Sequence, residues 1–191
     1  MKKLSLITLL LLFTLSTGLL AQSNRGEVVQ TGENNEILLE QIGYLNLVTV
    51  TQKECASNNQ INIQQQGGEN EALVTQLQYG NLVEIIQSGC LNLTDVTHDG
   101  HRNSSWVEQY GYANEVKLDL IGYNNSAVVG QDGNNNRIGQ ELIGDQLDFQ
   151  LFQSGNDNEL LQVEKGEGGQ PYSIEQHGNG IRTIIIHGAL R

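Results

Sequence analysis

The run NEILLEQIGYLNLVTVTQ at residues 35–52 contains two copies of one short pattern. In each copy an Asn is followed, after five residues, by a Gln. Gln41, which ends the first copy, leads through a short connection containing Gly43 to Asn46, which begins the second. A pattern that recurs at a fixed spacing is typical of proteins built from stacked structural repeats.

The same pattern extends along almost the whole chain. Fifteen Asn-to-Gln segments can be aligned, from residues 24–30 to residues 181–187. Extra residues occur between Gln52 and Asn59 and between Glu164 and Gln170, and both places are connecting segments, where insertions are tolerated. The amides that we expect to share one structural role are Asn35, Gln41, Asn46, Gln52, Asn59, Gln65, Asn70, Gln76, Asn81, Gln87, Asn92, Asn103, Gln109, Asn114, Asn125, Gln131, Asn136, Gln153, Asn158 and Gln176. The recurring glycines of the connections are Gly32, Gly43, Gly67, Gly89, Gly100, Gly111, Gly122, Gly133, Gly144, Gly155, Gly166 and Gly178.

Side chains alternate in character within each segment. Ile37 and Leu39 share the parity of the flanking Asn and Gln, whereas Glu36 and Glu40 have the opposite parity. Successive side chains of a strand point to opposite faces, so this alternation places the apolar residues and the amides on one inner face. A period of two indicates a strand, because a helix requires apolar spacing near 3.6.

These observations predict an all-β fold, a β-solenoid of stacked strand–arc–strand rungs. Strands of about seven residues joined by four-residue arcs would form two facing parallel sheets, with about 22 residues per rung and about seven and a half rungs. Glycine in each arc would supply the positive φ that a sharp reversal requires. The inner Asn and Gln side chains, half buried at the strand ends, would hydrogen-bond along the stack in amide ladders.

The first residues have the features of a signal peptide. A basic start at Met1–Lys3 precedes an apolar run over residues 4–20, and Ala21 offers a small residue before a cleavage site. We therefore expect residues 1–21 to be removed and residues 22–191 to form the solenoid. The mature protein would be secreted.

Composition and charge exclude several classes of function. The net charge is −12, which disfavours nucleic acid as a partner. We expect no enzyme, no small-molecule substrate and no cofactor, because no nucleophile motif or clustered acids are present. His98, Asp99 and His101 alternate in parity and form an incomplete ligand set, so no metal site is expected.

Three residues at unusual positions lead to separate expectations. Cys55 and Cys90 lie in arcs that the model of alternating strands places on opposite edges, so no intramolecular disulfide is expected. Glu164 occupies an inner position, where a carboxylate is costly unless it is paired or protonated. It is either a residue that tempers aggregation or one at a hydrated strand end.

The ends of such a stack carry unpaired backbone groups. We expect no polar cap at either end, so the ends of separate copies would bind each other. Because head-to-tail contacts do not close, the expected product is a homopolymeric filament.

The motif Asn-x5-Gln-x-Gly-x-x-Asn-x5-Gln resembles the curlin repeat over residues 24–187. The resemblance implies a subunit of curli, the extracellular amyloid fibres of the bacterial cell surface, which serve adhesion and biofilm. It also implies export through the outer-membrane curli secretion apparatus and contact with other curli subunits. Alternatives are the nucleating minor subunit and a monomeric solenoid that acts as a binding module or adhesin. The positions that depart from the motif are His98, Leu120, Leu142, Leu147, Glu164, Gln170, Ile181 and His187.

Overall fold

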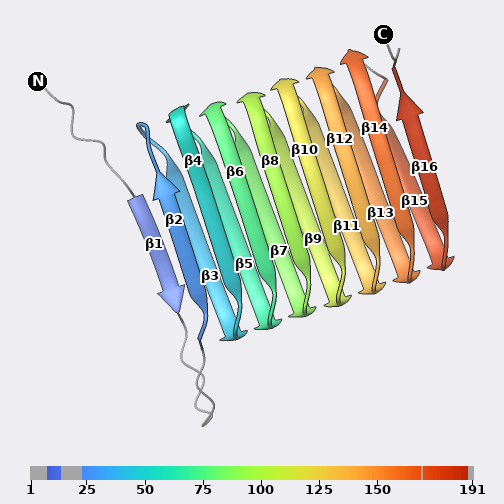
Figure 1. Cartoon of the computed structure of the whole chain (residues 1–191), viewed down its shortest axis with the longest axis horizontal. Helices are drawn as coiled ribbons and strands as arrows, with labels where there is room; N and C mark the ends of the chain where they lie inside the picture. The colour runs from blue at the N-terminus through green and yellow to red at the C-terminus, as the bar shows by residue number, and fades with distance from the viewer. Residues whose placement is uncertain (1–7, 14–22, 169, 189–191) are drawn as a thin grey trace, which may run out of the picture.

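The computed structural model of the chain describes residues 8–13, 23–168 and 170–188, with the backbone alone for residues 8–13, 54 and 55. Two eight-stranded parallel sheets face each other, and the chain crosses from one to the other after every strand (Figure 1). The odd sheet consists of β1 (Thr8–Phe13), β3 (Glu36–Tyr44), β5 (Gln60–Gly68), β7 (Leu82–Cys90), β9 (Ser104–Tyr112), β11 (Ser126–Asn134), β13 (Asp148–Asn156) and β15 (Tyr172–Asn179). The even sheet consists of β2 (Arg25–Gln30), β4 (Leu47–Ser57), β6 (Glu71–Tyr79), β8 (Leu93–His101), β10 (Glu115–Tyr123), β12 (Arg137–Asp145), β14 (Glu159–Glu167) and β16 (Arg182–His187). The predicted β-solenoid with two facing parallel sheets is therefore confirmed.

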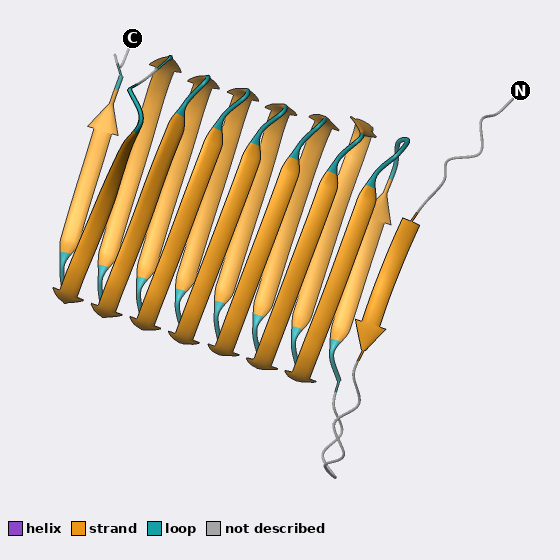
Figure 2. Ribbon diagram, turned by 180° about the vertical axis from the view of Figure 1, so that it is seen from behind, coloured by secondary structure: helices purple, strands orange, loops and turns teal. Residues whose placement is uncertain are grey.

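Neighbouring strands pair so that equivalent residues of successive repeats lie side by side. Gln65 lies opposite both Gln41 and Gln87 in the odd sheet, and the following glycines are aligned in the same way. Each rung contains about 22 residues. The strands stack in chain order from one end of the molecule to the other, and the view from behind shows the same arrangement for the opposite sheet (Figure 2).

The core lies between the two sheets and consists of the inner positions that the alternation predicted. Ile37, Val50 and Leu118 are at most 1% exposed, and Phe149 is the largest fully buried side chain. Burial of apolar surface contributes about 25 cal/mol per Å². This periodic burial also specifies register, because a slip of one residue would turn the inner set toward solvent.

The strands are longer than expected and the connections are shorter. Most strands have nine residues, because pairing continues through the glycine and the residue after it. Gly43 has a φ of 117°, and a Cβ at this position would lie 1.9 Å from the carbonyl oxygen of Gly67. Glycine is thus required both for backbone conformation and for the close approach of successive rungs.

A second left-handed residue completes most connections. Leu45, with a φ of 54°, directly precedes Asn46, and Ala113 has the same place before Asn114. The repeat pattern does not predict this left-handed position, because residues other than glycine mostly occupy it. The two-residue insertion after Gln52 lies within β4, where it forms a register shift opposite β6. Its predicted place in a connecting segment was therefore wrong, because strand pairing continues beyond Gln52.

At the N-terminal end, β1 pairs in parallel with the outer edge of β3, with residue 13 opposite Gln41. β1 lies within the expected signal peptide, whereas the predicted cleavage site at Ala21 lies outside the described residues. The described residues contain no helix that is long and apolar enough to cross a membrane.

Candidate functional site: amide ladders and end rungs

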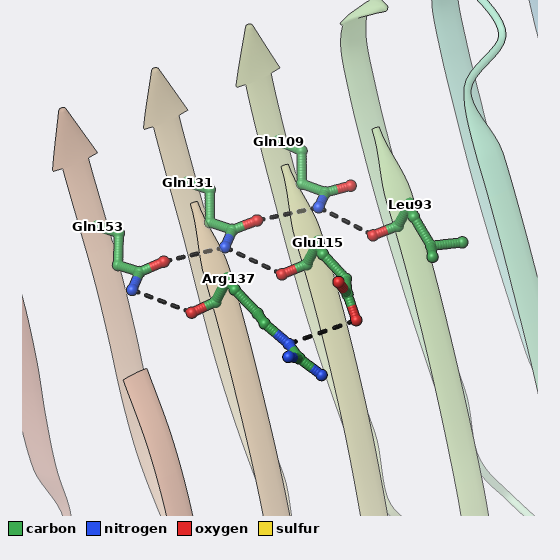
Figure 3. Close-up of polar contacts among 6 residues, drawn as sticks. All are labelled: Leu93, Gln109, Glu115, Gln131, Arg137 and Gln153. Atoms are coloured by element: carbon green, nitrogen blue, oxygen red, sulfur yellow. Dashed lines mark hydrogen bonds and ion pairs between the residues drawn. The ribbon is translucent and has the colours of Figure 1, made fainter. Parts of the chain in front are cut away.

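The glutamines of the odd sheet form one continuous hydrogen-bonded ladder. Gln109 Nε2 donates to Gln131 Oε1 at 3.0 Å, and Gln131 Nε2 donates to Gln153 Oε1 at 3.0 Å (Figure 3). The same bond joins Gln41 to Gln65 at the start of the stack, at 2.8 Å. The complete ladder runs through Gln41, Gln65, Gln87, Gln109, Gln131, Gln153 and Gln176. Each of the first six glutamines donates to the next one toward the C-terminal end, so the ladder has a head and a tail.

Most of these amides also tie the two sheets together. Figure 3 shows Gln131 Nε2 donating to the carbonyl oxygen of Glu115 at 3.1 Å, across the core from the odd sheet to the even sheet. Gln153 donates in the same way to the carbonyl oxygen of Arg137, at 3.1 Å. Because both amide hydrogens are used in a buried environment, the loss of one glutamine would leave its neighbours without partners.

The asparagines form ladders of the opposite sense. The backbone N–H of Asn92 donates to Asn70 Oδ1 at 3.1 Å, toward the N-terminal end. Its side-chain Nδ2 donates to the carbonyl oxygen of Gly111, in the connection one rung further on, at 3.1 Å. Each asparagine therefore supports the left-handed turn beside it and links it to the next rung. A side chain without an amide could not make both contacts.

The even sheet lacks a continuous glutamine ladder. Gln52 Nε2 donates to Gln76 Oε1 at 2.9 Å, but the next residue in the column is His98. Leu120 and Leu142 follow and are fully buried opposite each other. Gln30 begins the column, and Glu164 and His187 end it.

A second pair of amides lies two residues before this column. Gln140 Nε2 donates to Gln162 Oε1 at 2.8 Å, and both side chains are buried. The repeat pattern does not predict this pair, because the equivalent positions are apolar in the other repeats. The alternation of side chains along the strand does predict that Gln140 and Gln162 face inward.

All twenty amides named from the sequence are less than 4% exposed, so they are more deeply buried than the expected half burial. All twelve glycines named from the sequence have positive φ. The greater burial follows from the long strands, since pairing of the glycine and its successor covers the strand ends.

His98 is fully buried and its Nε2 is hydrogen-bonded to Ser105 Oγ. Burial lowers the pKa of His98 to about 3, because a charged imidazolium would be desolvated there. Its Nδ1 and the adjacent Gln76 Nε2 have no hydrogen-bond partner among the described residues. No group of three or more His, Cys, Asp or Glu that could hold a metal occurs in the described part of the chain.

Glu164 is buried and paired, which contradicts the expectation of a hydrated strand end. Its carboxylate accepts a hydrogen bond from the Tyr172 hydroxyl and lies 2.9 Å from His187 Nδ1. Gln162 Nε2 is a third partner at 3.3 Å. Burial, followed by the hydrogen bond to Glu164, raises the pKa of Tyr172 to about 12.

Cys90 is a free cysteine at the end of β7 in the odd sheet. The backbone of Cys55 lies near the end of β4 in the even sheet, whereas its side chain lies outside the described residues. Strands of the two sheets run in opposite directions, so the ends of β4 and β7 lie at opposite edges of the stack. The absence of a disulfide between them remains a prediction.

The two ends of the stack present complementary groups. At the N-terminal end, Gln30 Oε1 and Gln41 Oε1 are buried acceptors without a partner among the described residues. At the C-terminal end, Gln176 Nε2 donates to Thr183 Oγ1 at 2.7 Å and to the carbonyl oxygen of Glu159 at 3.3 Å, so the donor that this end offers is the Thr183 hydroxyl. Exposed apolar side chains occur at both ends and include Val29, Leu38, Ile184 and Ile186.

A family model described as the curlin associated repeat matches residues 21–53. The matched region includes β2, β3 and most of β4. In the odd sheet the following strands repeat its aligned Gln and Gly residues. A comparison with curated proteins gave no match.

Proposed function

Since the chain is a curlin-repeat protein, we propose that it is a structural subunit of an extracellular curli-type amyloid fibre that polymerises head to tail. In this proposal the main partner is a second copy of the same chain. The fibre is located at the bacterial cell surface, where it serves adhesion and the biofilm matrix.

The observation that carries this proposal is the polarity of the odd-sheet ladder. Along the ladder each glutamine donates to the next one toward the C-terminal end. The N-terminal end therefore offers Gln41 Oε1 as an acceptor, and the C-terminal end offers the hydroxyl hydrogen of Thr183, whose oxygen accepts from Gln176. The outer edges of β15 and β16 have no further strand among the described residues. Open strand edges are templates for pairing with another chain. Contacts between unlike ends do not close and therefore produce a filament.

The resemblance to the curli family suggests two further partners, the secretion apparatus and other curli subunits. Curli-type subunits are exported through an outer-membrane secretion apparatus and assemble with other curli subunits, and we extend both relations to this chain. The predicted signal peptide over residues 1–21 is consistent with export. No nucleic acid, cofactor or small-molecule substrate forms part of the proposal.

The direct test uses purified residues 22–191 left to assemble in buffer without nucleotide or cofactor. We expect fibres that bind an amyloid dye and diffract at a strand spacing of about 4.7–4.9 Å. A variant that combines Gln41→Ala with Gln176→Ala removes both terminal amides of the ladder. It should elongate about tenfold more slowly, because each unpaired buried group costs about 1–3 kcal/mol.

The matched control combines Gln64→Ala with Gln150→Ala, which changes two exposed glutamines of the same sheet. This control should elongate at the parent rate. A parent chain that stays monodisperse would contradict the proposal and would favour a monomeric binding module. Equal rates for the two double variants would exclude a role of the ladder in assembly.

A further inference from the structure

The number of strands specifies how two copies can join. The chain alternates between sheets after every strand, and β2 and β16 both belong to the even sheet. Among the described residues other than β1, the even sheet has one strand more than the odd sheet. The position that follows β16 along the solenoid is therefore in the odd sheet, directly beyond β15.

We propose that successive copies in the fibre are related by a half-turn about the stacking axis, so that β15 of one copy pairs with β2 of the next and β16 pairs with β3. This inference rests on the proposed fibre and adds its subunit geometry. A half-turn exchanges the places of the two sheets and reverses strand direction, so all new pairs remain parallel. If the next copy were not rotated, its β2 would lie in the even sheet. It would then either overlap β16 or lie beyond β16 and leave the odd sheet without a strand at that level.

The contact between β15 and β2 reproduces an arrangement found inside the molecule. Gln87 Nε2 donates to Gln109 Oε1 at 2.9 Å and to Thr94 Oγ1 at 3.2 Å, and the Thr94 hydroxyl donates to Gln109 Oε1 at 2.8 Å. At the C-terminal end, Gln176 and Thr183 have the same spacing in the sequence and the same mutual bond. Only the third glutamine is missing there.

The next copy would supply that third glutamine. In the half-turn arrangement Gln30 occupies the position opposite Gln176, because both residues end their Asn-to-Gln segments. Gln30 Oε1 is buried and has no partner among the described residues. It can accept hydrogen bonds from Gln176 Nε2 and from the Thr183 hydroxyl, as Gln109 does inside the stack.

The contact between β16 and β3 is complementary in charge and in apolar surface. Arg182 would lie opposite Glu36 and extend the column in which Arg182 already pairs with Glu159 at 2.9 Å. Ile184, 51% exposed, would lie opposite Leu38, 37% exposed. Burial of these two side chains against each other removes apolar surface from water at both ends.

β1 occupies the edge of β3 that this contact requires. Residues 8–13 pair with residues 36–41, the same stretch of β3 that would receive β16 of a neighbouring copy. Residue 13 lies opposite Gln41, whose Oε1 has no partner among the described residues. β1 and the neighbouring β16 therefore compete for one edge, and removal of residues 1–21 would free it.

Disulfide cross-linking of assembled fibres tests this geometry. In residues 22–191 carrying Cys55→Ser and Cys90→Ser, the half-turn pair is Ile184→Cys with Leu38→Cys. The unrotated pair is Ile184→Cys with Glu27→Cys. In each pair the two positions are at opposite ends of one copy, so every cross-link joins two copies. After mild oxidation and dissolution, we expect about tenfold more covalent multimers from the half-turn pair, because adjacent strands lie about 4.8 Å apart, within disulfide range.

A second pair of cysteines keeps the test valid if one of these substitutions prevents folding. Glu175→Cys with Val29→Cys tests the contact between β15 and β2 and should also form multimers. Retention of residues 1–21 should abolish the cross-link between positions 184 and 38. Fibres that cross-link through the unrotated pair, or through none of the pairs, would overturn the half-turn while leaving the proposed fibre intact. A parent chain that forms no fibres would overturn the proposed function itself.

Discussion

The two sheets of this solenoid fill the same structural position in different ways. In the odd sheet, seven glutamines form an unbroken ladder from Gln41 to Gln176. In the even sheet, the equivalent column contains only one glutamine-to-glutamine bond, between Gln52 and Gln76. Both sheets nevertheless stack their strands in chain order from β2 to β16. A glutamine ladder is thus not required at every strand end.

The even sheet fills part of its column with a matched apolar pair. Leu120 and Leu142 lie opposite each other and leave no amide to satisfy. The polar pair of this region is Gln140 and Gln162, two residues earlier on the same inner face. Replacing both partners of a buried hydrogen bond by apolar groups costs little, whereas replacing one partner leaves an unsatisfied group. The comparison of the two sheets therefore indicates that stability depends more on matched side chains in neighbouring rungs than on the type of residue.

The largest expected effect comes from breaking the odd-sheet ladder at its centre. Gln109→Leu removes the donor to Gln131 and the acceptor of Gln87. We expect a loss of about 3 kcal/mol in the free energy of unfolding, because buried amide groups are left unpaired. Guanidinium denaturation of freshly prepared, unassembled residues 22–191 measures this change. Gln150→Leu, on the exposed face, should change stability by less than about 0.5 kcal/mol. Similar losses in the two variants would contradict the ladder's contribution.

The converse change in the even sheet should also destabilise the protein. Leu120→Gln introduces an amide between His98 and Leu142, so neither side offers a matched partner. We expect a loss of about 2–3 kcal/mol from the unsatisfied amide. The triple variant His98→Gln, Leu120→Gln and Leu142→Gln extends the ladder from Gln76 and should recover part of that loss. Additive losses in the triple variant would show that matching between rungs is unimportant.

His98 should make the even sheet sensitive to acid. Its pKa of about 3 in the folded protein lies below the ordinary value of 6.5, so the unfolded chain takes up a proton first as pH falls. Its contribution to stability is complete above pH 6.5 and decreases through the range from 6.5 to 3, by about 1.4 kcal/mol per pH unit. Between pH 7.5 and pH 5, His98→Gln should therefore lose about 2 kcal/mol less than the parent. Denaturation midpoints at the two pH values provide the measurement.

The exposed His177 serves as the control for this comparison. His177→Gln should retain the parent's acid sensitivity, because it removes a histidine whose side chain is 68% exposed and leaves the buried His98 in place. If the His98 and His177 variants respond equally to acid, the acid sensitivity does not arise from the buried histidine.

The smallest expected change in unfolding free energy comes from substitutions on the outer face of either sheet. Arg137 Nε lies 3.5 Å from a carboxylate oxygen of Glu115, and both side chains are exposed (Figure 3). Exposed ion pairs contribute about 0–1 kcal/mol. Arg137→Ala should therefore change the unfolding free energy by about 0.5 kcal/mol or less, and a loss similar to that of Gln109→Leu would contradict the dominance of the inner face.

Much of this architecture could be predicted from the spacing of residues alone. Alternation around Ile37 and Val48 identified the inner face, and the glycine near Gln41 identified the connection. Both are local signals, because they depend on periodicity and on the conformational freedom of glycine. The left-handed residue at Leu45 had no such signal, since leucine has no preference for that conformation.

Contacts between rungs were less predictable. The pairing of Glu164 with Tyr172 depends on side chains from facing strands, and the displacement of the polar pair to Gln140 depends on the residue one rung away. The bond from each Asn side chain to a connection on the next rung depends on the exact path of the left-handed turns. These features require coordinates, because the repeat pattern states which positions are equivalent but not how neighbouring positions compensate.

Solid-state NMR of fibres with diluted labelled chains tests the central claim most directly. Labelled residues 22–191 would be mixed with an excess of unlabelled chain before assembly, so that only contacts within one copy give signals. We predict that the side chain of Gln109 contacts those of Gln87 and Gln131 and that these contacts survive dilution. Loss of these contacts on dilution, with Gln109 stacked on Gln109 of other copies, would contradict a solenoid subunit.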